Sequence, residues 1–192
     1  MIDEVEKFHG HMCPGVAIGI LAACVALAEF GRSSDLNEIV AITETNMCAV
    51  DGIQYLMGCT VGRGNLIQHD HGKNAYSFVR TSDGASLRLT VKQEAWRRSP
   101  EHEALLAKTK EGIATDDETR RYWDLQRDVS AHILDQELGN IFNYSREQVS
   151  VSRPSRDMHY LVCDSCKEMT NVSRLKKFGN EKLCEPCSAS NV

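Results

Sequence analysis

The chain has 192 residues, of which 42% are hydrophobic and 6% aromatic, and its formal net charge is −5 at pH 7. This length suits one ordinary domain with a small addition, and the apolar fraction is sufficient for a buried, mainly aliphatic core. The acidic charge, without a basic stripe, disfavours nucleic-acid binding.

The longest uncharged apolar run, residues 16–28, is shorter than the ~20 residues that cross a bilayer. Acidic residues precede this run and no basic region leads it, so it does not resemble a secretion signal. We therefore expect a cytoplasmic protein without a membrane partner. In that compartment, eight cysteines point to metal or thiolate chemistry rather than to disulfides.

The first predicted element is a helix over residues 14–30. Pro14 suits its first turn and Gly31 is placed to end it. Because nearly every residue between them is apolar, the helix is expected to be buried on all sides. In so small a chain this favours packing on its own sheet and against a second subunit, hence a homodimer. A central core helix in a monomer is the alternative.

Four elements follow in chain order: a strand at 37–45, a helix at 49–58, a short strand at 63–69 and a hairpin at 75–92. The hairpin is the clearest local signal, since two alternating runs flank Asp83–Gly84, a pair typical of tight turns. The hairpin requires antiparallel pairing, whereas the first two strands, separated by a helix, can pair in parallel. The pattern indicates a mixed sheet.

Two helices are predicted next, at 101–111 and 117–138, with Gly139 ending the second. Residues 145–160 are polar, contain a short β-like segment and are interpreted as a linker. The resulting organisation is a core domain at 1–150 and a small domain at 159–192. The fold class is α+β: a mixed-sheet core of order α-β-α-β-β-β with added helices, followed by a zinc-ribbon-like domain.

The last four cysteines have the spacing C-x2-C-x17-C-x2-C, in Cys163, Cys166, Cys184 and Cys187. Two such pairs can hold one Zn²⁺ tetrahedrally, with no open position for chemistry. A tail of some 30 residues buries too little apolar surface to fold alone, so a structural metal would stabilise it. Two redox dithiols or an iron–sulfur site are the alternatives.

A second group of metal-ligating residues begins in "FHGHMCPG", where His9, His11 and Cys13 alternate. In an extended segment these three side chains would point to one side. Cys48 and Cys59 flank the predicted helix at 49–58. Imidazoles and thiolates suit a transition metal, and equally a thiolate paired with a base. Single cysteines are more often core residues, as we expect for Cys24.

The segments "FHGHMCPGVAIG", "NMCAVDGIQYLMGCTVGRGNL" and "DHGKNAYSF", followed by the four-cysteine ribbon, resemble the FmdE family. That family is named for the fifth lettered component, E, of molybdenum- or tungsten-dependent formylmethanofuran dehydrogenase. The resemblance implies an α+β core, a homodimer and a metal-compatible cleft. Residues carried over by it are His11, Cys13, Cys48, Asp51 and Cys59, with Asn65, Asp70 and Lys73 nearby.

For a second metal site we rank His11, Cys13 and Cys59 first and His9 and Cys48 second. The chain has no ferredoxin-type cysteine spacing and no flavin or nicotinamide motif. We therefore expect an accessory protein that holds a metal, or passes a metal or cofactor to a molybdenum or tungsten enzyme.

Two alternatives stay open. One is an enzyme that uses a cysteine thiolate or a catalytic zinc, with His11, Cys13, Cys48, Asp51, Cys59 and Lys73 as candidate residues. The other is an interaction or regulatory module that binds a partner through the ribbon.

Overall fold

The computed structural model describes residues 1–31, 38–151 and 158–190. Part of the predicted linker, residues 152–157, lies outside this range. The chain divides into two compact units, Met1–Arg153 and Pro154–Val192, which are described separately below. In the described part of the chain, no helix is both long and apolar enough to cross a membrane.

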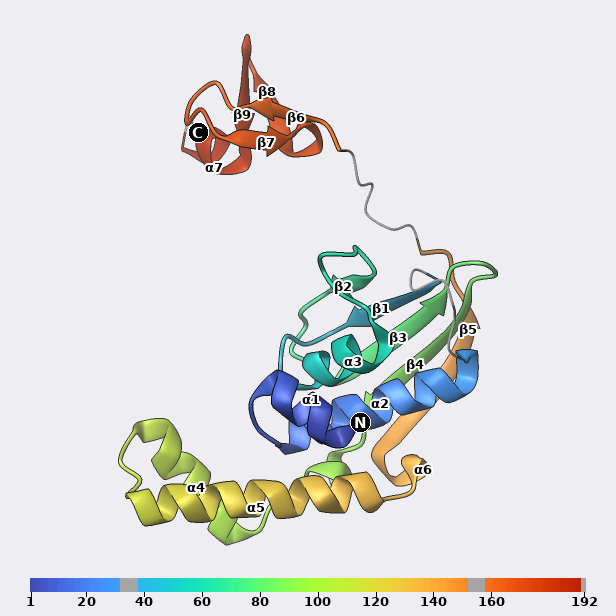
Figure 1. Cartoon of the computed structure of the whole chain (residues 1–192), viewed down its shortest axis with the longest axis vertical. Coiled ribbons are helices and arrows are strands. Elements are labelled where there is room, and N and C mark those ends of the chain that lie inside the picture. The colour runs from blue at the N-terminus through green and yellow to red at the C-terminus, as the bar shows by residue number, and fades with distance from the viewer. Residues whose placement is uncertain (32–37, 152–157, 191–192) are drawn as a thin grey trace. The chain divides into compact units, whose positions relative to one another are not determined.

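The first unit contains a five-stranded mixed sheet and the helices that pack on it (Figure 1). The strand order is β2-β1-β3-β4-β5; β1 pairs with β2 in parallel and every other pair is antiparallel. This confirms the predicted α+β class with a mixed sheet. In chain order the elements are α1 (Ile2–His9), α2 (Pro14–Phe30), β1 (Ile39–Thr43), α3 (Ala49–Met57), β2 (Leu66–Gln68), β3 (Ala75–Arg80), β4 (Ala85–Val91), η1 (Gln93–Trp96), α4 (Pro100–Glu111), α5 (Asp116–Asp135), α6 (Leu138–Ile141) and β5 (Phe142–Gln148).

The second unit is a small four-cysteine domain built from two two-stranded sheets, β6-β7 and β8-β9. Its elements are β6 (Tyr160–Val162), β7 (Met169–Asn171), η2 (Val172–Arg174), β8 (Leu175–Phe178), β9 (Glu181–Cys184) and α7 (Glu185–Ala189). Its apolar core is very small: Cys163, Leu183 and Cys184 are buried, and Leu175 and Cys187 pack against them.

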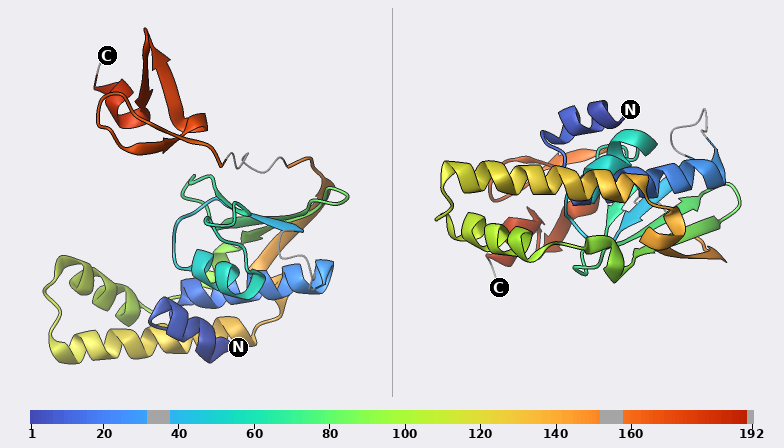
Figure 2. Two further views of the ribbon diagram at one scale, coloured as in Figure 1. Left: turned by 45° about the horizontal axis from the view of Figure 1, so that its top comes forward. Right: turned by 90° about the horizontal axis from the view of Figure 1, so that it is seen from below.

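The main core lies between one face of the sheet and helices α2 and α3, which cover that face (Figures 1 and 2). Tyr76, Phe78, Leu87 and Leu89 project from β3 and β4 into it and are fully buried. Helix α2 is buried along most of its length by the sheet, α3 and α5 of the same chain. Its uniformly apolar sequence therefore does not require a second copy, and the homodimer stays a prediction.

Helices α2 and α3 meet at unusually close range. A Cβ on Gly19 would lie 2.1 Å from the Ala49 carbonyl oxygen, and a Cβ on Gly52 would lie 2.9 Å from the backbone of Gly19 and Ile20. Both glycines are thus required by backbone-to-backbone contact rather than by a turn. This contact brings the N-terminal ends of the two helices together.

Three local predictions were wrong. The lead-in to α2 is not extended: residues 2–9 form α1, which ends at Gly10 with φ 98°. The polar segment after residue 141 begins with β5, an edge strand whose side chains are exposed after Phe142, so it gives no apolar alternation. Helix α5 ends at Asp135, and Gly139 lies inside the short α6.

Gly19→Ala should lower the free energy of unfolding of the full chain by about 3 kcal/mol, because the new methyl group collides with backbone that cannot rotate away. Urea unfolding measures this. Gly139→Ala is the matched control, since a Cβ there meets nothing within 4 Å, and should change stability by less than about 0.5 kcal/mol. Equal effects would contradict the close contact.

Candidate metal centres

Two cysteines stand at the N-terminal ends of the two closely packed helices. Cys13 is the N-cap residue of α2 and Cys48 is the N-cap residue of α3. Between them lies Gly15, where a Cβ would come within 3.0 Å of Cys48 Cβ and 3.7 Å of Cys13 Sγ. The absence of a side chain at this position lets the two thiols approach each other. Helix N-termini also carry partial positive charge, which favours thiolates.

His9 joins these thiols from the last turn of α1. Its Nδ1 donates a hydrogen bond to Asp51 Oδ2 at 2.6 Å, which fixes the ring. Its Nε2 is buried and has no hydrogen-bond partner among the described residues. A carboxylate on one ring nitrogen and an unpaired second nitrogen is the arrangement of metal-ligating histidines in proteins.

The three side chains form a compact donor set, hereafter the N-terminal triad: His9, Cys13 and Cys48. One ligand atom from each lies within 4.8 Å of the other two. One nitrogen and two sulfur donors suit zinc and neighbouring transition metals. With three protein ligands, a tetrahedral ion keeps one position open.

The electrostatics favour one thiolate at this site. The Cys13 thiol donates to Cys48 and the His9 charge lies close by; against the opposing effect of burial, these lower the pKa of Cys48 to about 5. The same interaction with Cys48, together with burial, raises the pKa of Cys13. Burial lowers the pKa of His9, but the hydrogen bond with Asp51 and the charge of Cys48 outweigh it and raise the pKa.

The other predicted site residues lie elsewhere. Cys59 is fully buried in the core, where its Sγ lies 3.6 Å from both the Ile39 carbonyl oxygen and Asn65 Nδ2. The His11 ring stacks between His9 and Trp123, with centroid separations of 4.6 and 4.9 Å. The structure thus groups the two ligands that we ranked second, His9 and Cys48, with Cys13.

The remaining candidates are not part of the triad. Asp51 holds His9 rather than standing as one of its three donors. Lys73 is largely exposed and lies 4.0 Å from Glu44. Asp70 is exposed and accepts a hydrogen bond from the Gly72 amide. His102, expected at the surface, is buried beside Tyr122, so that expectation was wrong.

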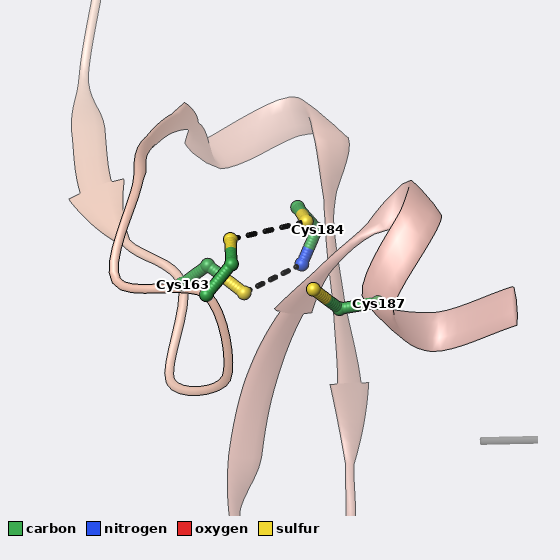
Figure 3. Close-up of side chains that lie close together, drawn as sticks. Cys163, Cys184 and Cys187 are labelled. Carbon is green, nitrogen blue, oxygen red and sulfur yellow. Dashed lines mark hydrogen bonds between the residues drawn. The ribbon is translucent and has the colours of Figure 1, made fainter. Parts of the chain in front are cut away.

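In the second unit all four cysteines come together, again with their sulfur atoms within 4.8 Å of one another. Figure 3 shows Cys163, Cys184 and Cys187 converging from the end of β6, the end of β9 and α7. The Cys184 amide donates to Cys163 Sγ at 3.3 Å and lowers the pKa of Cys163 to about 6. Four thiolates of this kind can hold one metal ion in a closed site.

The model of the family described as "FmdE, Molybdenum formylmethanofuran dehydrogenase operon" matches residues 8–143, which include the whole N-terminal triad. The chain belongs to the FmdE family. It is also similar to a crystal structure of an FmdE-like protein of the tungsten formylmethanofuran dehydrogenase type from Syntrophus aciditrophicus. That match has a TM-score of 0.58 and 19% identity, and covers 98% of this chain and 90% of the other. It supports the FmdE fold.

A curated relative from Archaeoglobus fulgidus, named as a probable S-adenosyl-L-methionine-binding protein, is 30% identical over 201 residues. The alignment covers 99% of this chain and 53% of the relative. The chain therefore spans about half the length of that protein. The ligand in its name is assigned to a protein with a large additional part, so it does not define the ligand of this FmdE-family chain.

Asp51→Asn should weaken metal binding at the N-terminal triad by about 10-fold or more, because the neutral amide no longer supports His9 as a carboxylate does. A competition titration of Co²⁺ against a chromophoric chelator measures the affinity. Asp70→Asn is the matched control: it neutralises an exposed carboxylate of the same family motif and should leave the affinity unchanged. Equal affinities in both variants would contradict the role of Asp51.

Cys166→Ser should remove the metal from the second unit and unfold it, since the apolar core there is too small to hold the fold alone. Limited proteolysis followed by mass spectrometry should then show rapid cleavage within residues 158–190 while the first unit stays intact. Ser165→Ala serves as the control and should resist proteolysis like the wild type. A protease-resistant, metal-free Cys166→Ser unit would contradict a structural metal.

Proposed function

We propose that this protein is a metal-binding accessory protein of the FmdE type, with an exchangeable transition-metal ion in the N-terminal triad and a structural Zn²⁺ in the four-cysteine unit. The observation that carries the proposal is the buried, unpaired Nε2 of His9 beside two thiols, with Asp51 on the opposite ring nitrogen. A histidine that served only the fold would have both nitrogens paired or exposed.

The number of ligands supports different roles for the two sites. Four thiolates fill a tetrahedral ion, as in structural zinc sites, whereas three ligands leave a position for an incoming group. The thiols and imidazole of the triad are soft or borderline donors, compatible with passing on a metal or a sulfur-ligated cofactor. The family is named for a molybdenum enzyme operon, and we propose a molybdenum or tungsten enzyme as the recipient.

A second candidate function uses the same open position for catalysis. A zinc ion with three protein ligands can bind water, lower its pKa and supply hydroxide as a nucleophile. The partial exposure of Cys48 and of the His11–Trp123 stack beside the triad favours access from solvent. Hydrolytic turnover that disappears with the triad metal would favour this enzyme over a metal carrier.

Metal content per chain tests the proposal. Protein purified without added metal should hold about two ions, and Cys48→Ser about one, because each site binds one ion. Cys24→Ser is the matched control: Cys24 is another half-buried cysteine, lies in α2 outside the triad, and its variant should keep two. One ion in the wild type, even after incubation with Zn²⁺ or Co²⁺, would overturn a metal role for the triad.

A further inference from the structure

Two buried hydroxyl groups face each other across neighbouring strands of the sheet. Thr43, the last residue of β1, is the register partner of Tyr76 in the antiparallel β1–β3 pair. Both side chains are 0% exposed, and neither Thr43 Oγ1 nor Tyr76 Oη has a hydrogen-bond partner among the described residues. Buried polar groups are rarely left so in folded proteins unless a water or a ligand satisfies them.

These hydroxyls lie on the helix-covered face of the sheet, toward the triad. Tyr76 packs in the same core cluster as Ala49 and Ile53 of α3. Directly paired residues of antiparallel strands point to the same face, so Thr43 projects on the same side as Tyr76. The chain then runs from Thr43 to Cys48 in five residues.

Electrostatics agree with this placement. Burial, and after it the negative charge of Cys48, raises the pKa of Tyr76. The Tyr76 hydroxyl therefore keeps its proton at neutral pH and is available as a hydrogen-bond donor. A threonine hydroxyl is a donor at any pH.

We propose that Thr43 and Tyr76 form an oxygen-binding subsite next to the N-terminal triad, which receives a small carboxylate bound to the open position of the triad metal. The proposal rests on the metal site of the proposed function. One carboxylate oxygen ligates the ion and the other accepts hydrogen bonds from the two hydroxyls. No bond of the carboxylate is broken, and the binding is reversible.

The chemistry of the subsite favours this ligand class. The two hydroxyl groups are neutral donors, so the positive charge that attracts the anion comes from the metal. Hydrogen bonds to a charged acceptor are stronger than those between neutral groups, and more so away from water. The buried setting limits the size of the ligand.

The test uses the full chain loaded with Co²⁺, whose visible absorption responds to a new ligand. Acetate is titrated into the wild type, Tyr76→Phe and Thr43→Val. Each variant removes one hydroxyl and should weaken acetate binding about tenfold, as expected for one hydrogen bond to a charged group. The Co²⁺ content should not change. Ser77→Ala is the control: Ser77 is the next residue of β3, faces the other side of the sheet and should leave acetate binding unchanged.

The outcomes separate this proposal from the metal site itself. If the triad binds Co²⁺ but its spectrum does not respond to acetate, or if all three variants bind acetate like the wild type, the subsite is overturned and the metal site stands. A hydroxyl pair that holds only a structural water gives that second result. If no Co²⁺ binds to the triad, both proposals are overturned. Thiocyanate, which binds metals through nitrogen, should lose far less affinity than acetate in the two hydroxyl variants.

Discussion

The close contact between α2 and α3 determines where the chemistry of this protein lies. Gly15 and Gly19 are one turn apart on one face of α2, and Gly52 of α3 packs against that face with almost no space between the backbones. Each helix begins at a cysteine, so the contact that aligns the helices also aligns Cys13 with Cys48. A larger residue at any of these glycines would separate the helices and with them the two thiols.

Helix α3 supplies both a ligand and the group that orients a second ligand. Cys48 and Asp51 are three residues apart, a spacing that places two side chains on the same side of a helix. Cys48 faces Cys13, while Asp51 holds the His9 ring at the end of α1. One turn of one helix therefore coordinates two neighbouring helices. Because these elements are buried against the sheet, the triad is held in place before any metal arrives.

The sequence predicted the elements whose signals are local. Helix α2, the Asp83–Gly84 hairpin and the four-cysteine spacing each depend on neighbouring residues, and the structure contains all three. Helix α1 was missed because the alternation of His9, His11 and Cys13 resembles a strand. The run before His9, with acidic residues in its first turn and Gly10 after it, has the pattern of a capped helix.

The choice between Cys48 and Cys59 required tertiary structure. Both flank α3 in the sequence, and nothing in their immediate neighbours separates a ligand from a core residue. In the fold, the N-terminal end of α3 meets α2 and leaves Cys48 half-exposed, whereas Cys59, beyond its C-terminal end, is buried in the core beside Ile39 and Asn65. The same holds for Thr43 and Tyr76, which are ordinary strand residues until the register pairs them.

The two metal sites differ in how binding and folding are coupled. In the four-cysteine unit, sulfur ligands make up most of the buried core, so metal binding supplies the free energy that orders the chain and release of the ion means unfolding. The N-terminal triad is carried by helices whose apolar faces are already buried, so an ion can enter and leave without unfolding them. A site that exchanges its ion, or that opens a coordination position to a ligand, needs this independence. The chain therefore places its exchangeable ligands on the large core and its closed set on the small one.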